Sequence, residues 1–109
     1  MATTYKVLGQ SNPSATTVTT LYTVPSATQA VVSTIVIANL AATSATFRIA
    51  VRVAGATLAN SQYVAYDVTV GASDSTALTL GITLGAADVV TVYASTANLT
   101  FTAFGSEIA

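Results

Sequence analysis

The chain has 109 residues, a formal net charge of −1, and a charged fraction of 6%. This length fits a single domain with one core, and the charged fraction is far below the roughly 25% of an ordinary soluble domain. Three cations are too few to neutralise the several phosphates that useful nucleic-acid affinity requires. We therefore expect no direct nucleic-acid partner, and little electrostatic repulsion between copies of the chain.

The residue types that carry most side-chain chemistry are missing. With neither His nor Cys in the chain, Ser/His/Asp and Cys/His triads and zinc sites with nitrogen or sulfur ligands are excluded. The carboxylates are Asp67, Asp74, Asp88 and Glu107, without the regular spacing of a calcium loop. Asp74 and Asp88 fall in expected turns, where Asp is favoured for local hydrogen bonds. We expect a non-enzymatic protein with no catalytic residue, no cofactor and no metal ligand.

The beginning of the chain, "MATTYKVLGQSNPSA", lacks the pattern of a secretion signal. It has no basic segment followed by an apolar one, and no run in the chain is long enough to cross a bilayer. We expect synthesis in the cytoplasm and no membrane partner.

Alternation with a period of two residues, together with many β-branched side chains, recurs along the chain. Segments rich in Gly, Pro, Asn, Asp or Ser separate these stretches. We expect about eight strands, at residues 5–8, 18–24, 30–39, 45–54, 63–70, 76–84, 89–94 and 99–108. Any helix should be a single turn. The prediction is all-β: one antiparallel β-sandwich domain over residues 1–109, with either a jelly-roll or an immunoglobulin-like topology.

The strand expected at residues 30–39 has two mostly apolar faces. The alternation places Val31, Ser33, Ile35 and Ile37 on one face and Val32, Thr34, Val36 and Ala38 on the other. Such a strand is central and covered on both sides. The cover over the second face is a loop of the same chain, a sister copy or another protein, so Val32, Thr34 and Val36 are candidate interface residues.

The next strand, in "ATFRIAVRVAG", separates core from surface more clearly. Its expected core residues are Phe47, Ile49, Val51 and Val53. Arg48 and Arg52 lie on the opposite face. They either contact a carboxylate on a neighbouring protein, which makes them candidate interface residues, or remain solvated or paired with an Asp of the same chain.

Two further patterns concern single positions. In "LTLGITL", the core face is expected to hold Leu78, Leu80, Ile82 and Leu84, and Gly81 is expected at a bulge, a bend or a close backbone approach. In "YVAYDV", Tyr63 and Tyr66 point to opposite faces of a regular strand. We therefore expect no aromatic stacking platform there.

Several segments resemble small β-rich accessory virion proteins of tailed bacteriophages, notably those of cyanophages and other marine phages. The segments are "LYTVP", "FRIAVR", "LTLGITL", "DVVTVYAS" and the final "FGSEI", and the resemblance spans residues 5–108. It implies a β-sandwich that serves as a structural or attachment piece of the particle. It supplies no active residue.

The leading functional hypothesis is a capsid decoration or cement protein. It would act in the virion as a homo-oligomer, expected to be a trimer, against the major capsid protein or other virion proteins. Burial of Ala, Val and Thr surface and edge-strand pairing would stabilise the shell. The alternative is a tail-, baseplate- or fibre-associated module that binds a host-surface glycan. For that role the best polar loop residues are Asn60 and Gln62.

Overall fold

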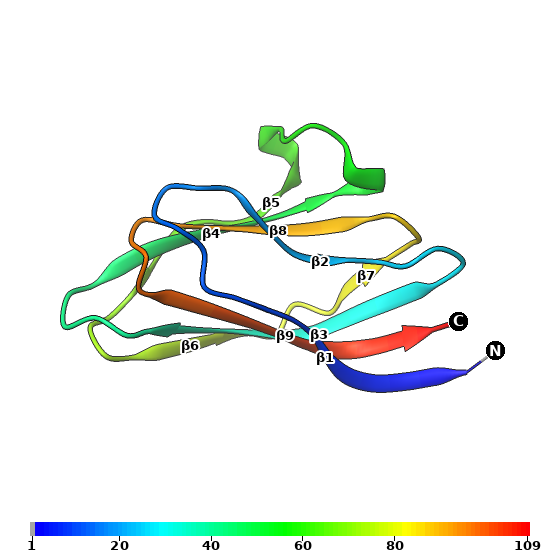
Figure 1. The fold of residues 1–109 in the computed structure, drawn as a ribbon, viewed down its shortest axis with the longest axis horizontal. Helices are drawn as coiled ribbons and strands as arrows, with labels where there is room; N and C mark the ends of the chain where they lie inside the picture. Colours follow the sequence, from blue (N-terminus) through cyan, green and yellow to red (C-terminus); the bar gives the residue numbers. More distant parts are fainter. Residues whose placement is uncertain (1) are drawn as a thin grey trace.

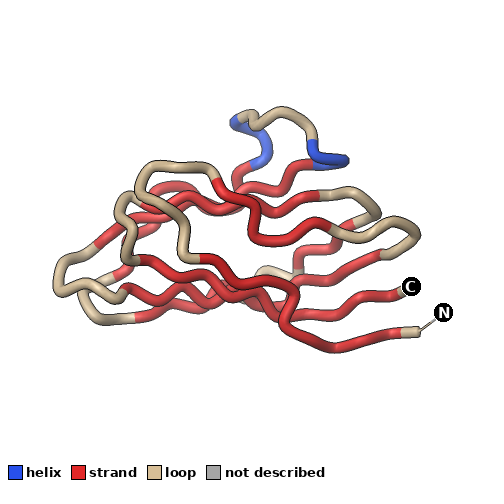
Figure 2. Tube along the Cα trace, in the orientation of Figure 1, coloured by secondary structure: helices blue, strands red, loops and turns tan. Residues whose placement is uncertain are grey.

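The alternating stretches form strands close to where the alternation predicts them. The computed structural model of the protein describes residues 2–109, in which strands dominate (Figure 2). The strands are β1 (Thr3–Ser11), β2 (Thr19–Thr23), β3 (Gln29–Asn39), β4 (Ala45–Arg52), β5 (Tyr63–Val70), β6 (Ser75–Leu78), β7 (Ile82–Leu84), β8 (Val89–Ala94) and β9 (Leu99–Ile108). The two helices of this part of the chain are 3₁₀ turns, η1 (Val53–Gly55) and η2 (Asn60–Gln62). Neither could span a membrane.

The strands form two antiparallel sheets that face each other (Figure 1). The first sheet has the order β1-β9-β3-β6, with β7 also paired to β3, and the second has the order β2-β8-β4-β5. The pairs are nested along the chain: β1 with β9, β2 with β8, β3 with β6 and β7, and β4 with β5. Nested antiparallel pairs that are divided between two sheets are the topology of a jelly roll. The predicted antiparallel β-sandwich is confirmed.

Apolar side chains of both sheets fill the space between them. Phe47 and Phe101 are fully buried and meet edge to face, with ring centroids 6.0 Å apart. The largest fully buried side chains are Phe47, Phe101, Ile35, Ile37, Ile49, Leu99, Val24, Val32, Val90 and Val92. The inward orientation predicted for Phe47 and Ile49 is therefore confirmed, while Val51 is only half-buried.

A bulge in β3 reverses part of the predicted alternation. The pairing of β3 with β9 shifts between Val32 and Thr34, which makes Ser33 an extra residue. Val32 is therefore only 1% exposed and lies in the core together with Ile35. The prediction that Val32 shares the outer face with Thr34 and Val36 is wrong, because one inserted residue moves every preceding side chain to the other face. Thr34 and Val36 are half-buried.

Two predicted core residues lie outside the core because their strands end early. Strand β4 ends at Arg52 and η1 begins, so Val53 is 66% exposed. The strand predicted over residues 76–84 is interrupted between β6 and β7, where Gly81 has a φ of 62° and Leu80 is 48% exposed. A Cβ on Gly81 would meet no atom within 4 Å. Gly81 thus marks a bend and not a close approach.

Candidate functional site

The two turn aspartates hold backbone groups, as the sequence predicts. Asp74 accepts a hydrogen bond from the backbone N–H of Ser75 at 2.8 Å. Asp88 accepts from Ala54 and from Gly85, both at 2.9 Å. In residues 2–109, no group of three or more acidic side chains is placed to hold a metal ion. These two carboxylates therefore organise turns.

A polar contact joins the two sheets at the end where the termini lie. The phenol of Tyr22 on β2 donates a hydrogen bond to Glu107 on β9, and Lys6 on β1 lies 2.9 Å from the same carboxylate. Burial and the hydrogen bond to Glu107 raise the pKa of Tyr22 well above its usual value. The hydrogen bonds from Tyr22 and Lys6 lower the pKa of Glu107. At neutral pH the protonated phenol of Tyr22 therefore donates to the ionised carboxylate of Glu107. We call this contact between the two sheets the clamp.

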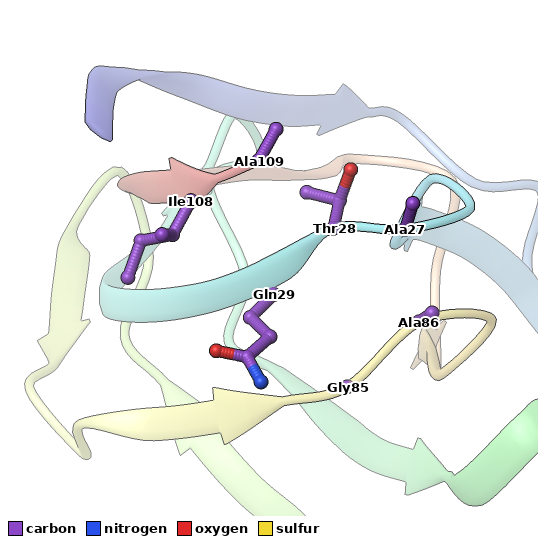
Figure 3. Close-up of a pocket in the computed structure, with 7 residues that line it drawn as sticks. All are labelled: Ala27, Thr28, Gln29, Gly85, Ala86, Ile108 and Ala109. Atoms are coloured by element: carbon purple, nitrogen blue, oxygen red, sulfur yellow. The ribbon is translucent and has the colours of Figure 1, made fainter. Parts of the chain in front are cut away.

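A hollow at the same end of the molecule is lined by residues whose side chains do not titrate. Its volume is about 300 Å³. It is lined by Ala27, Thr28, Gln29, Gly85, Ala86, Ile108 and Ala109 (Figure 3). Thr28 donates its hydroxyl proton to the carbonyl of Ser26. None of these lining residues has a side chain that titrates.

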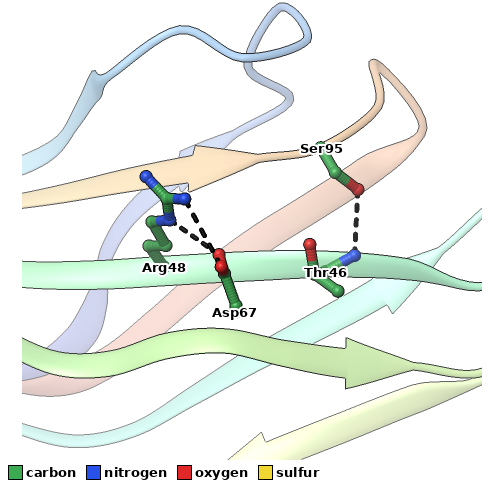
Figure 4. Close-up of polar contacts among 4 residues, drawn as sticks. All are labelled: Thr46, Arg48, Asp67 and Ser95. Atoms are coloured by element: carbon green, nitrogen blue, oxygen red, sulfur yellow. Dashed lines mark hydrogen bonds and ion pairs between the residues drawn. The ribbon is translucent and has the colours of Figure 1, made fainter.

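Arg48 is paired inside the chain. Its Nε donates to Asp67 Oδ1 at 2.7 Å and its Nη2 donates to Oδ2 at 3.4 Å (Figure 4). The guanidinium lies 4.2 Å from the ring centroid of Tyr66 and 4.5 Å from that of Tyr93. The hydrogen bond to Asp67 raises the pKa of Arg48 further above its usual value, so this side chain stays charged. Pairing with an Asp of the same chain, one of the alternatives that the sequence left open for Arg48, is thus observed, and a contact with a neighbouring protein stays a prediction.

Arg52 makes a separate contact. Its Nε donates to the carbonyl of Ala56 at 2.7 Å, which ties the end of β4 to the segment after η1. The ion pairs within residues 2–109 are Lys6 with Glu107 and Arg48 with Asp67. Arg48 and Arg52 therefore do not form one joint cationic site.

The expectation that Tyr63 and Tyr66 point to opposite faces is wrong. The register of β5 against β4 shifts twice, so that Tyr63 pairs with Ala50 while Tyr66 and Asp67 lie opposite Arg48. Positions 48 and 50 share the outer face of β4, so the two tyrosines meet there, with ring centroids 4.9 Å apart. The sequence signal for this irregularity is the Asp within a strand otherwise rich in β-branched residues.

The outer face of the first sheet carries an apolar surface. We define the apolar outer face as Tyr5, Val7, Thr34, Val36 and Phe104. Tyr5 is 83% exposed, Val7 47% and Phe104 40%, and the register places Val7 and Thr34 on either side of Phe104. The charged residues of β1 and β9, Lys6 and Glu107, alternate with these positions and pair with each other. Of the predicted interface residues, Thr34 and Val36 lie on this face.

Figure 1 shows the 53–62 segment, with η1 and η2, above the second sheet, on the side away from the first sheet. Ala50 and Thr91 of the second sheet are almost fully buried although they belong to its outer side. The outer faces of the two sheets thus differ. That of the first sheet is the apolar outer face, and that of the second sheet carries the 53–62 segment and the arginine and tyrosine side chains.

Comparison of the chain with protein-family models, with curated proteins and with solved structures gave no match.

Proposed function

We propose that the protein is a non-enzymatic structural subunit of a bacteriophage virion, a capsid decoration or cement protein. It binds between capsid subunits as a homo-oligomer, expected to be a trimer, and stabilises the shell. The phage assignment rests on the sequence resemblance. The mode of action rests on one structural observation, the uncharged apolar outer face around Phe104.

Burial of this face is favourable because exposed apolar area is removed from water, at roughly 25 cal/mol for each Å². Its side chains are short or rigid, so ordering them on contact costs little entropy. Strand β1 is a second means of attachment, since within residues 2–109 it pairs with β9 alone and its other edge has no strand partner. Edge strands are commonly protected by charged side chains, but Lys6, the charged residue of β1, is engaged by Glu107. Strand β1 has a bulge between Val7 and Gly9, so pairing with another chain would use the regular segment from Thr3 to Val7.

The first test is the molar mass in solution, measured by light scattering after size exclusion over a range of concentrations. We expect an oligomer that persists on dilution for the wild type, and a shift to monomer for Phe104→Asp. The control is Leu40→Asp, at a loop residue that is 67% exposed, which should leave the mass unchanged. A wild-type monomer at every concentration would contradict the proposal of an obligate oligomer.

The second test is the position of the protein on the particle. Gold-labelled antibodies against the protein, applied to particles of the phage that encodes it, should label the capsid. Labelling confined to the tail would instead support the tail-, baseplate- or fibre-associated attachment module. Particles that lack the protein altogether would refute a role in the virion.

A further inference from the structure

The arginine and tyrosine side chains on the outer face of the second sheet form a cluster together with one aspartate. We define the Tyr66 cluster as Arg48, Tyr63, Tyr66, Asp67 and Tyr93. Asp67 has a φ of 50°, in the left-handed region, which Asp adopts more readily than most residues. The bulge places Asp67, whose side chain is 47% exposed, in an ion pair with Arg48, whose side chain is 24% exposed. Exposed ion pairs and exposed cation–π contacts contribute little to stability.

The bulge of β5 at Asp67 places the ring of Tyr66 next to the hydrogen-bonded pair of Arg48 and Asp67. Arg48 packs on one side of the Tyr66 ring at 4.2 Å, and Tyr63 meets that ring nearly at a right angle, 83°. Tyr66 nonetheless remains 55% exposed. The ring is thus held in position by its neighbours while much of its surface faces solvent. Such preorganisation lowers the entropy lost when a ligand binds.

The polar groups of the cluster are only partly used. A carboxylate can accept about four hydrogen bonds and a guanidinium has five N–H donors, whereas the pair between Arg48 and Asp67 uses two of each. The remaining donors and acceptors lie beside the aromatic ring. Because one cation faces one anion, the cluster carries no net charge and does not favour a charged ligand.

We infer that the Tyr66 cluster is a binding site for a neutral saccharide. A pyranose ring presents C–H groups on its faces, which pack against the electron-rich face of an aromatic ring. Its hydroxyls are donors and acceptors together, and so match the free positions of Arg48 and Asp67. The adjacent cleft, bordered by Val18, Leu58 and other side chains, has a volume of only about 10 Å³. The sugar therefore lies on the open surface, and we expect binding in the millimolar range.

This site lies on the opposite side of the sandwich from the apolar outer face (Figure 1). A subunit attached through Phe104 would leave the Tyr66 cluster accessible. The saccharide site is therefore independent of the proposed assembly role. The two proposals can fail separately, because Phe104→Asp tests one and Tyr66→Ala tests the other.

The test is nuclear magnetic resonance of the tyrosine rings in the ¹³C-labelled full chain. The probes are four neutral disaccharides, maltose, cellobiose, lactose and mannobiose, each titrated to about 50 mM, which covers the affinity expected for so small a contact. At least one should shift the signals of Tyr63, Tyr66 and Tyr93 in a saturable manner. Tyr5 and Tyr22, the other two of the five tyrosines, lie outside the cluster and should not respond.

Variants then separate the roles of the ring and the carboxylate. Tyr66→Ala should weaken binding at least about 10-fold, and Asp67→Asn about 5-fold, while Tyr66→Phe should stay within about 2-fold because it keeps the ring. The control is Leu40→Ala, which removes an exposed side chain that belongs neither to the cluster nor to the apolar outer face. Thermal unfolding of each variant checks that the fold is retained.

Absence of saturable shifts with all four sugars, or undiminished binding by both Tyr66→Ala and Asp67→Asn, would overturn the inference. Protection of these rings by a virion protein without any response to sugar would identify a protein contact instead.

Discussion

At the residue scale, two glycines allow backbone contacts that a side chain would prevent. A Cβ on Gly105 would overlap the carbonyl oxygen of Val31, and a Cβ on Gly9 would overlap that of Leu21. Gly105 lies on β9 opposite Lys6 of β1 and Val32 of β3, and the bulge of β3 follows directly after Val32. Gly105 therefore lies where a neighbouring backbone approaches too closely for a side chain.

We predict that Gly105→Ala lowers the free energy of unfolding by about 3 kcal/mol or more, because the obstacle is backbone and cannot rotate away. Gly71→Ala is the control. Its Cβ would make its closest contact at 3.7 Å, an ordinary van der Waals distance, so its effect should stay within about 1 kcal/mol. Urea unfolding measures both. Equal midpoints for wild type and Gly105→Ala would show that the sheet relaxes around the new methyl group.

The clamp between Tyr22 and Glu107 makes stability depend on pH in two ranges. The pKa of Glu107 is lower in the folded protein, so its contribution is present above the unfolded pKa of about 4.3 and is lost as the pH falls through the folded value. The pKa of Tyr22 is raised, so its contribution is complete below the unfolded pKa of about 10 and declines at higher pH.

Urea unfolding of the wild type, Tyr22→Phe and Glu107→Gln at several pH values tests this prediction. Glu107→Gln should be less stable than the wild type at pH 7, and the difference should shrink as the medium becomes acidic. Tyr22→Phe should lose part of the decline in stability above pH 10. A constant difference between wild type and Glu107→Gln at all pH values would contradict the role given to the carboxylate.

At the scale of elements, Asn39 fastens the end of β3 to two connections. It is 4% exposed, and its Nδ2 donates to the carbonyl of Thr43 at 2.8 Å, with longer contacts to Val70 and Gly71 at 3.3 and 3.2 Å. Its Oδ1 accepts from the backbone N–H of Ala41 at 3.0 Å. One amide thus joins the β3–β4 loop to the turn between β5 and β6.

We predict that Asn39→Ala destabilises the protein by about 3 kcal/mol, because buried carbonyl groups lose their donor and water cannot easily replace it. Asn12→Ala is the comparison. Its Nδ2 donates to Ala97 and Leu99 in a less buried setting, so the cost should be about 1 kcal/mol. Chemical unfolding of the two variants gives the difference. Similar costs for both would mean that burial of the Asn39 amide contributes little.

At the scale of the whole molecule, the two outer surfaces differ in their charged groups. The apolar outer face has no charged side chain, whereas the Tyr66 cluster includes an ion pair. The association that we propose through the first face would therefore depend on burial of apolar area. Salt screens charge interactions but does not weaken apolar contacts.

The proposed oligomer should accordingly keep its mass in about 1 M NaCl and become more stable in sodium sulfate, which strengthens apolar burial. Light scattering at fixed protein concentration and increasing salt measures this. Dissociation in NaCl would show that ion pairs, and not the surface around Phe104, hold the copies together.

Local sequence patterns were sufficient for the class of fold, most strand positions and the turn roles of Asp74 and Asp88. Alternation and turn chemistry act over a few neighbouring residues, so they can be read directly from the chain. Strand register is different, because it depends on pairing between distant segments. A single extra residue in β3 moved Val32 into the core, and the two shifts in β5 brought Tyr63 and Tyr66 together. The contact between Tyr22 and Glu107 joins residues 85 positions apart. Bulges and cross-sheet contacts of this kind arise when whole strands pack, since the free energy of the assembled sheets outweighs the local preference for regular alternation.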